Sequence, residues 1–201
     1  MDRNESIFAY LKAQGFTDEQ IKKTLELASQ CLAETREKPD FSTIEDGDHF
    51  FYCGIEFVRL GKEQGGILCV TAQPWKDEIP FDEENSNNWA KSTLRDVLHK
   101  EFFPLLDARN LKPISCDLTA DNGDDRYGET NDAVGILSCD QIRKYRRFLP
   151  HYDTWVWTCT PWYINDSGYG NFVRLLNPAG YLDYNFAYNS IGVAPACVFI
   201  E

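Results

Sequence analysis

The chain has 201 residues, with 20 Lys and Arg against 32 Asp and Glu, so its formal net charge at neutral pH is −12. This surplus of acidic groups argues against proteins that bind nucleic acid or anionic membranes without specificity, because both of those partners attract basic surfaces. Hydrophobic residues make up 43% of the chain, which is enough to build the core of one domain.

The sequence lacks the signals of membrane and secreted proteins. No apolar run approaches the ~18 residues that span a bilayer, and the N-terminus has neither the basic region nor the apolar core of a secretory signal. The seven cysteines include no C-x-x-C pair, and several lie in apolar, strand-like runs. These patterns predict a cytoplasmic protein with buried, reduced thiols rather than a disulfide framework or a zinc site. We expect neither a bound metal nor a cofactor.

Residues 1–40 are predicted to form a helical hairpin. One helix ends at Gly15, and a second begins near Thr17, where Gln20 stands at the spacing of a capping box. Pro39 and the charged residues before it end the second helix. A hairpin this small cannot bury its own apolar face, so it must pack on the rest of the chain or on a partner. A DNA-binding helix-turn-helix is disfavoured because the second helix carries few basic residues.

Residues 45–201 are predicted to form a second domain in which strands mix with short helices. In chain order the predicted segments are strands at 49–60 and 67–73 joined by a turn at 61–66, a helix within 88–106, a strand at 133–138, a helix at 139–149, and strands at 154–160, 171–177 and 192–200. The helix within 88–106 is capped by Ser92 and has apolar residues at Leu94, Val97, Leu98, Phe102 and Leu105. Because strands and helices do not alternate regularly, the fold class is α+β with mainly antiparallel strands.

Five short motifs between residues 46 and 200 carry a resemblance to a known family. They are Asp46-Gly47-Asp48 with Gly54–Leu60, Asn88-Trp89 with Ser92–Leu98, Asp132 with Gly135–Ser138 and Tyr145, Trp155–Thr158 with Pro161, and Asn177, Gly180 and Tyr181 with Gly192–Ala196. In these motifs the chain resembles an uncharacterised domain family of phages, prophages and gut bacteria.

The resemblance implies a C-type-lectin-like fold, related to the variable proteins of diversity-generating retroelements. In that fold helices pack beside small twisted sheets, and the C-terminal loops and strands present a binding face. Thr158 and Ala194 stand where the family usually has arginine. The family has no established common chemistry, so the resemblance implies a binding face without implying a reaction.

The C-terminal quarter is rich in aromatic and amide side chains. Tyrosine offers a large, stiff contact area with a polar tip, and asparagine adapts its hydrogen bonds, so this composition is typical of recognition surfaces. The alternative is that some of the rings fill a loop-rich core. The predicted partner-binding residues of this segment are Trp162, Tyr163, Asn165, Tyr169, Asn171, Tyr184, Asn185, Tyr188 and Asn189.

Acidic charge is concentrated in residues 41–86, where ten acidic and three basic residues give a net charge of −7. The acidic stretch is either a solvated loop or a surface that imitates nucleic-acid phosphates and occupies a basic groove of a partner. Phe81 and Trp75 could anchor such a contact. The predicted contact residues are Asp77, Glu78, Phe81, Asp82, Glu83 and Glu84.

Two further charged groups have less specific patterns. Residues 117–125 hold acidic and amide oxygens that could bind Ca²⁺, but not at the spacing of an EF-hand. Arg143, Lys144, Arg146 and Arg147 could contact a phosphate or an acidic protein. Pairing of these cations with nearby acidic residues is the more economical interpretation.

The sequence contains no G-x-S-x-G, Walker A or H-E-x-x-H motif. We therefore expect a non-enzymatic binding protein, encoded by a phage or mobile element, that acts on a protein partner in the host cytoplasm. The charge favours a basic, nucleic-acid-binding host protein, as for an inhibitor of a CRISPR effector. The alternative is a receptor- or glycan-binding module of a virion or cell surface. No direct contact with nucleic acid or membrane is expected.

Overall fold

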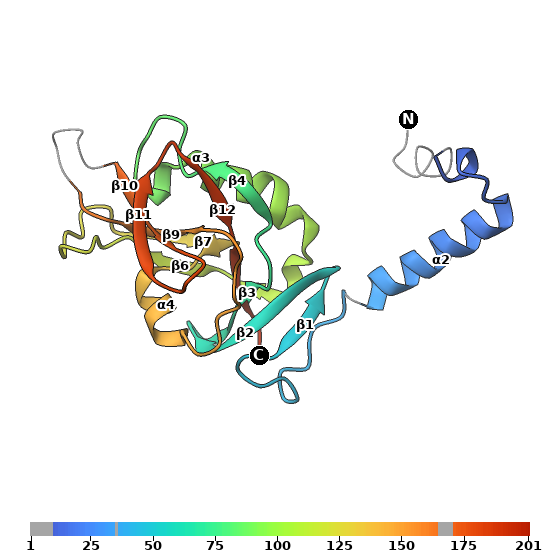
Figure 1. Ribbon diagram of the computed structural model, residues 1–201. Helices are drawn as coiled ribbons and strands as arrows, with labels where there is room; N and C mark the ends of the chain where they lie inside the picture. Colours follow the sequence, from blue (N-terminus) through green and yellow to red (C-terminus); the bar gives the residue numbers. More distant parts are fainter. Residues whose placement is uncertain (1–9, 35, 165–170) are drawn as a thin grey trace. The chain divides into compact units, whose positions relative to one another are not determined.

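The computed structural model describes residues 10–34, 36–164 and 171–201 (Figure 1). The chain divides into two compact units, Met1–Glu37 and Lys38–Glu201. Within the described ranges, no helix combines the length and the apolar character that a bilayer-spanning segment needs.

The N-terminal unit contains helix α2 (Asp18–Glu34), preceded by a helical turn at 10–13. Thr17 and Gln20 form the predicted capping box, in which the Gln20 N–H donates to Thr17 Oγ1 at 3.2 Å and the Thr17 N–H donates to Gln20 Oε1 at 2.9 Å. Gly15 precedes them with a φ of +90°, a left-handed conformation that glycine adopts without strain. The predicted start of the second helix and the break before it are confirmed.

Three sheets build the larger unit. The first sheet contains β1 (His49–Tyr52), β2 (Ile55–Glu63), β3 (Gly66–Thr71), β5 (Leu111–Lys112), β8 (Gly135–Ile136) and β13 (Pro195–Phe199). The second contains β4 (Lys76–Pro80), β9 (Val156–Pro161), β10 (Phe172–Leu176), β11 (Leu182–Phe186) and β12 (Ser190–Val193). The third is the pair β6 (Ile114–Asp117) and β7 (Glu129–Asp132).

Strand order places β11 and β4 at opposite edges of the second sheet, which runs β11-β10-β9-β12-β4. The first sheet runs β1-β2-β3-β13-β5, and β8 also pairs with β13. Among the described strands, only β9 and β12 pair in parallel, at Val156 and Gly192. The larger unit is therefore α+β with mainly antiparallel strands, as the sequence predicts.

The first two sheets share one hydrophobic core. Phe57 and Phe199 of the first sheet belong to the same buried cluster as Trp157 and Val173 of the second. Strand β12 leads into β13 through Ala194, so the chain passes from one sheet to the other at a single residue. The C-terminal strands are thereby held by both sheets.

The predicted strand 49–60 is instead a hairpin of β1 and β2. Cys53 and Gly54 have φ values of +52° and +78°, so they form a two-residue turn in the left-handed region. The turn before β3 lies at Gln64 and Gly65, within the predicted turn at 61–66 but shorter than it. The apolar pattern of the sequence runs through Cys53 without a break, which hides the first turn.

The predicted helix within 88–106 is a series of short helical segments, namely η1 (Trp89–Lys91), α3 (Thr93–Val97), the π-helical η2 (Leu98–Phe102) and η3 (Phe103–Leu105). Ser92 caps α3 as predicted and accepts the Arg95 N–H at 3.2 Å. The wider π-helical turn shifts the buried face by one residue. As a result Leu106 is buried, and Leu105, which the sequence places on the apolar face, is 45% exposed.

Helix α4 (Cys139–Tyr145) begins where the sequence predicts but ends before Arg146 rather than at Pro150. Its start is fixed by a second capping box, in which Ser138 Oγ accepts the Gln141 N–H and Gln141 Oε1 accepts the Ser138 N–H. The sequence pattern predicts neither β11 nor the β6–β7 pair.

Six cysteines have side chains that the structure describes, and none of these six forms a disulfide. Cys53 is half-buried, and the other five are buried. Burial raises the pKa of the Cys69 and Cys139 thiols, which keeps them protonated at neutral pH. The prediction of buried, reduced thiols is confirmed for these five residues. The side chain of Cys31 lies outside the described part of the chain.

Candidate binding surface

A row of aromatic rings in edge-to-face, tilted and stacked contact crosses β10 and β11 beside the end of β9. Its members, which we call the aromatic ladder, are Tyr163, Trp162, Tyr184, Phe172, Phe186 and Tyr188. Phe172 lies opposite Phe186 in the β10–β11 register. Because side chains alternate between faces along a strand, Tyr184 shares a face with both. The rings of Trp162 and Tyr184 stack with centroids 4.2 Å apart and planes 9° from parallel.

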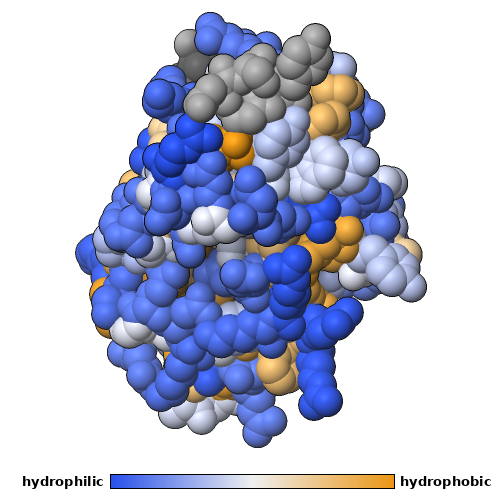
Figure 2. Space-filling view, turned by 90° about the vertical axis from the view of Figure 1, so that its left-hand side faces the viewer, coloured by the Kyte–Doolittle hydropathy of each residue, from blue (hydrophilic) through white to orange (hydrophobic). Residues whose placement is uncertain are grey.

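The outer half of the aromatic ladder is open to solvent. Tyr184 is 43% exposed, Phe186 is 39% exposed and Tyr188 is 51% exposed. Figure 2 views the side of the molecule that carries β10 and β11, and pale and orange side chains gather in its upper right part on an otherwise mostly blue face. A contiguous row of exposed rings with a polar rim is the kind of surface that proteins use for recognition.

The aromatic ladder contains four of the predicted C-terminal residues and two that the sequence reasoning missed. Trp162, Tyr163, Tyr184 and Tyr188 come together as members, whereas Phe172 and Phe186 were not in the predicted set. The signal for Phe186 is its alternation with Tyr184, which is visible only once β11 is assigned as a strand. The predicted residues Asn165 and Tyr169 lie outside the described ranges.

The predicted asparagines fix the backbone around the ladder instead of joining it. The Asn171 carbonyl accepts the Ala187 N–H at 2.9 Å. Asn185 Oδ1 accepts the side-chain N–H of Asn189 at 2.6 Å and the backbone N–H of Phe186 at 2.9 Å. These bonds hold the turn after β11 and leave the rings as the exposed contact area.

Strand β11 is an edge strand, and two of its outward-facing N–H donors have side-chain acceptors. Alternation of the antiparallel ladder, set by the bond from the Ala187 N–H toward β10, points the N–H groups of Tyr184 and Phe186 away from the sheet. Asp183 Oδ1 accepts the Tyr184 N–H at 2.9 Å, and Asn185 does the same for Phe186. Each side chain therefore covers the donor of the next residue.

Two residues of the predicted acidic contact are buried and cannot reach a partner. Phe81 is fully buried, with its ring centroid 5.8 Å from those of both Trp89 and Trp157. Asp82 is buried as well, because its carboxylate accepts the N–H groups of Ser86 and Thr93 at 2.7 Å and 3.1 Å. Both residues belong to the fold and not to a contact surface, which corrects the sequence-based assignment.

Trp75, the other predicted anchor, is also partly covered. Its ring lies 5.3 Å from the ring of Phe102, measured between centroids, and Lys76 Nζ lies 4.6 Å above it. Lys76 in turn pairs with Glu101 at 2.7 Å. The aromatic residues of the acidic stretch therefore stabilise the domain.

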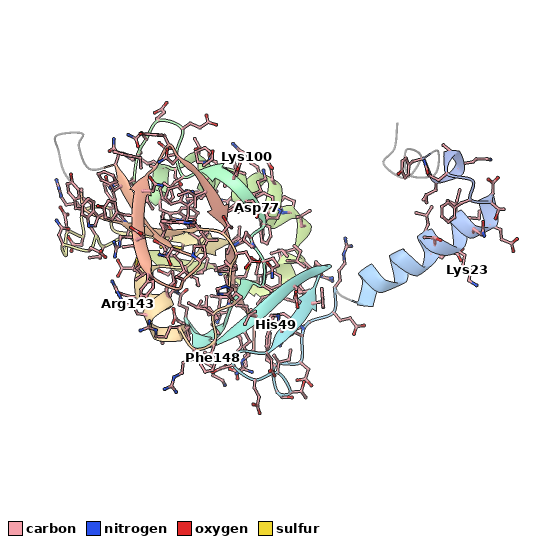
Figure 3. All side chains as sticks on the ribbon, viewed as in Figure 1. Lys23, His49, Asp77, Lys100, Arg143 and Phe148 are labelled. Atoms are coloured by element: carbon pink, nitrogen blue, oxygen red, sulfur yellow. The ribbon has the colours of Figure 1, made fainter. Side chains whose placement is uncertain are left out.

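The remaining acidic residues of the stretch are exposed and unpaired. We call Asp77, Glu78, Glu83 and Glu84 the acidic edge; Figure 3 labels Asp77 beside β4. Their carboxylates make no hydrogen bond or ion pair with any residue in the described ranges. Elsewhere many carboxylates have cationic partners, as Asp46 has Arg59 and Asp132 has Arg95. Uncompensated negative charge is therefore concentrated at this edge.

A small cleft joins the two predicted surfaces. It has a volume of about 290 Å³ and is lined by Asp77, Glu78, Thr154, Trp155, Asn185, Ser190 and Ile191. Asn185 lies at the end of β11, just before the turn into β12. Strand β12 pairs with β4, so this turn lies close enough to β4 for Asn185 to line the cleft. Trp155 is 40% exposed in its wall. The structure thus brings the start of the acidic edge next to the strand that carries the aromatic ladder.

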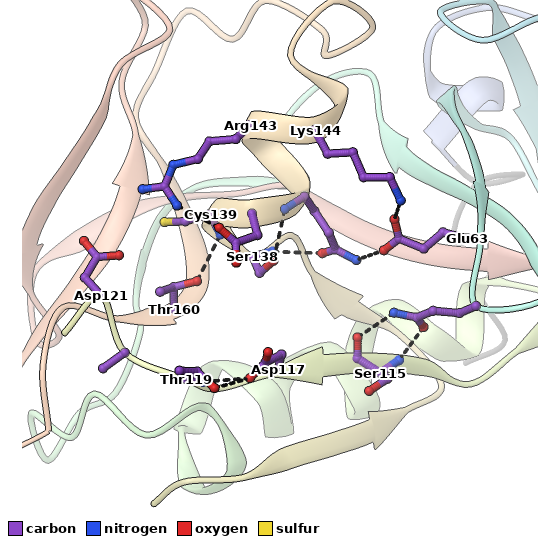
Figure 4. Close-up of a pocket in the computed structure, with 14 residues that line it drawn as sticks. Glu63, Ser115, Asp117, Thr119, Asp121, Ser138, Cys139, Arg143, Lys144 and Thr160 are labelled. Carbon is purple, nitrogen blue, oxygen red and sulfur yellow. Dashed lines mark hydrogen bonds and ion pairs between the residues drawn. The ribbon is translucent and has the colours of Figure 1, made fainter. Parts of the chain in front are cut away.

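A larger polar cleft of about 660 Å³ lies between α4 and β6 (Figure 4). Its charged side chains have hydrogen-bond or ion-pair partners, either in the cleft or, for Asp121, on Arg174 of β10. Glu63 accepts hydrogen bonds from Gln141 and Lys144 at 2.7 Å and 2.6 Å. Burial by itself would raise the pKa of Glu63, but these two bonds and one from Tyr145 outweigh it and hold the pKa below its ordinary value. Glu63 is therefore a fixed anion and not a proton donor.

The thiol and hydroxyl groups of the polar cleft are buried or hydrogen-bonded within the fold. Cys139 is buried, and burial raises the pKa of its thiol, which disfavours the nucleophilic thiolate. Ser138 caps α4, and Thr160 Oγ1 accepts the Cys139 N–H at 3.0 Å. No histidine lines this cleft among the described residues. Ser115 and Thr119 donate their hydroxyl groups to Glu129 and Asp117 at 3.2 Å and 2.6 Å.

The loop considered for Ca²⁺ uses its oxygens internally. Asp117 accepts two bonds from Thr119, Asp121 pairs with Arg174 at 3.0 Å, and Asp124 pairs with Arg126 at 2.8 Å. In the described parts of the chain, no three His, Cys, Asp or Glu side chains are grouped to hold a metal ion.

The basic residues of α4 are partly paired, as the sequence interpretation expects. Arg143 bonds Asp140 at 2.8 Å, and Lys144 bonds Glu63. Arg146 and Arg147 follow the helix and are exposed. Comparison of the chain with protein-family models, with curated proteins and with solved structures finds no match.

Proposed function

We propose that the protein is a non-catalytic binding protein that engages a basic protein partner through the aromatic ladder and the acidic edge. The observation that carries the proposal is the exposed outer half of the ladder, Tyr184, Phe186 and Tyr188. Large aromatic side chains supply much of the binding energy in protein interfaces, because they bury a large area at a low cost in conformational entropy.

The acidic edge indicates that the partner's surface is positively charged. Four carboxylates without cationic partners attract a basic surface over a distance of about 8 Å at physiological ionic strength. They also raise the association rate, which falls as salt is added. The small cleft is lined by both Asp77 and Asn185, so a partner that enters it contacts β11 and the acidic edge together.

The proposal includes the finer fold and the biological setting. We infer a C-type-lectin-like domain preceded by a helical hairpin, in a phage or mobile-element protein that inhibits a host nucleic-acid-directed defence in the host cytoplasm. Support comes from the small sheets with helices beside them and from the position of the aromatic ladder on the C-terminal strands. The paired, buried polar groups of the larger cleft support a function without catalysis.

The test is capture of a partner by immobilised protein from a lysate of the host bacterium, with mass spectrometry at low and high salt. Three variants accompany the unchanged protein: Tyr184→Ala with Tyr188→Ala, Asp77→Asn with Glu78→Gln, and the matched control Glu45→Gln with Asp125→Asn. We expect one basic protein that the unchanged protein and the control retain and that the other two variants lose. If all three double variants retain the same protein as the unchanged protein does, the proposal is contradicted.

A glycan is the second candidate ligand, and the stacked rings favour it. The faces of aromatic rings carry partial negative charge and attract the C–H groups of a sugar ring. Binding on a glycan array that Tyr184→Ala abolishes, with no retained protein in the capture experiment, would support a receptor- or glycan-binding module instead.

A further inference from the structure

A separate cleft of about 540 Å³ lies between the end of α4 and the turn that joins β10 to β11. Ile142 and Leu176 are buried at its base, and Leu149 and Leu182 are half-buried. Its volume lies in the range of small-molecule sites, and an apolar wall with a few polar groups is the usual composition of such sites. The cleft is distinct from the aromatic ladder and from the acidic edge.

The charged groups that line this cleft are all basic. They are Arg143 and Arg146; His151 also lines the cleft, and no Asp or Glu is among the lining residues in the described ranges. This is unusual in a chain with 32 acidic and 20 basic residues. The small cleft beside β4 carries two acidic residues, and the polar cleft beside α4 mixes both signs.

Of the two guanidinium groups in the cleft, that of Arg146 has no ion-pair partner among the described residues. Arg143 donates to Asp140 at 2.8 Å, so part of its charge is neutralised. Arg146 makes no ion pair with any residue of the described chain. His151 lies 3.9 Å from Asp153. A single unpaired guanidinium beside an apolar wall matches a ligand with one negative charge better than a doubly charged phosphate.

The opposite wall is held rigid. Asn177 Oδ1 accepts the N–H groups of both Ala179 and Tyr181 at 3.0 Å. Gly180 has a φ of +82°, which suits glycine in this tight turn. Tyr181 is 70% exposed at the rim. Because these bonds already order the wall, binding a ligand costs less conformational entropy.

We propose that this cleft binds a small molecule that carries a carboxylate on an apolar body. Arg146 pairs with the carboxylate, Arg143 adds a weaker attraction, and the apolar body packs on Ile142, Leu149 and Leu176. This site does not depend on the proposed protein partner, because it uses none of the residues of the aromatic ladder or the acidic edge.

The experiment compares two probes with the same apolar body and opposite charge, 4-phenylbutanoate and 4-phenylbutylamine. Each is titrated into the full chain, and binding is followed through the methyl NMR signals of Leu149, Leu176 and Leu182. We expect the acid to shift these signals at concentrations at which the amine does not. Equal binding of both probes, or no binding of the acid, overturns the proposal without affecting the proposed protein contact.

The variant Arg146→Gln tests the carboxylate partner, and Arg147→Gln is its matched control. Both arginines are exposed neighbours, but Arg147 does not line the cleft. Loss of a charge-assisted hydrogen bond predicts that Arg146→Gln weakens the acid about tenfold or more. The control is expected to bind as the unchanged protein does. An equal loss in both variants indicates attraction to general positive charge and overturns the assigned site.

Discussion

The indole of Trp162 lies flat against the phenol ring of Tyr184, with centroids 4.2 Å apart. Phe172 of β10 meets both rings edge-on, at 5.2 Å and 5.3 Å between centroids. Trp162 directly follows β9, so this group of three rings ties the edge strand β11 to the interior strands of its sheet. The same rings that form the proposed contact area therefore also hold it in place.

This stacking predicts a measurable coupling between Trp162 and Tyr184. In a double-mutant cycle with Trp162→Leu and Tyr184→Leu, we expect a coupling in the free energy of unfolding of about 0.5–1.5 kcal/mol. Urea denaturation provides the measurement. Tyr181→Leu serves as the control, because Tyr181 is 70% exposed. A coupling of Trp162 with Tyr181 as large as that with Tyr184 would show that the stack has no specific energetic role.

The two halves of the acidic stretch are expected to respond differently to substitution. Asp82→Ala leaves the N–H groups of Ser86 and Thr93 without their acceptor, so we expect it to lower the free energy of unfolding by about 2–3 kcal/mol. Asp77→Ala removes an exposed, unpaired carboxylate and should change it by less than about 0.5 kcal/mol. Thermal and urea denaturation of both variants test this. Similar effects of the two substitutions would contradict the assignment of Asp82 to the fold.

Asp132 predicts a loss of stability in acid. Burial by itself would raise the pKa of Asp132, but hydrogen bonds from Arg95, Trp89 and Thr130 outweigh it and hold the pKa below its ordinary value of 3.8. The unfolded chain therefore takes up this proton more readily than the folded one. The stabilisation is complete above the unfolded pKa, near 4, and is lost as the pH falls through the lower, folded pKa.

We therefore expect the free energy of unfolding to fall between about pH 4 and pH 2, and less steeply in Asp132→Asn. Urea denaturation at several pH values measures the slope. Should Asp132→Asn not fold, the carbon-13 signal of the Asp132 carboxyl group in the unchanged protein gives the answer directly. Titration of that carboxyl group above 3.8 is the result that would refute the prediction.

The buried thiols are predicted to be inert in the native protein. Cys69, Cys116, Cys139, Cys159 and Cys197 are all buried. In a variant with Cys31→Ser and Cys53→Ser, we expect no rapid reaction with Ellman's reagent until denaturant is added. Five thiols should then react. A rapidly reacting thiol in the native variant would place at least one of the five within reach of solvent.

Local signals in the sequence predicted the helix starts well. Thr17, Ser92 and Ser138 each stand before a helix and accept the backbone N–H three residues on, so the short-range chemistry of the cap is enough. The α+β class and the β2–β3 pairing also follow from the pattern of apolar residues. These features depend on residues that are close together in the chain.

The missing parts depend on residues that are far apart in the chain. Strand β11 has the sequence Leu-Asp-Tyr-Asn-Phe, without β-branched residues, and it becomes a strand because it pairs with β10. The burial of Phe81 requires Trp157, which lies 76 positions later and supplies one of its walls. A surface assignment for an acidic segment needs this tertiary information, since Phe81 and Asp82 look no different in sequence from their exposed neighbours.

The covered donors of β11 bear on how the protein behaves at high concentration. An edge strand lined with exposed rings would ordinarily be a template for stacking further chains into fibrils. Here an incoming strand finds the N–H groups of Tyr184 and Phe186 already bonded to Asp183 and Asn185. Addition of a strand at Tyr184 and Phe186 would have to break these two bonds, which disfavours growth through this part of β11 while the rings remain exposed to a partner.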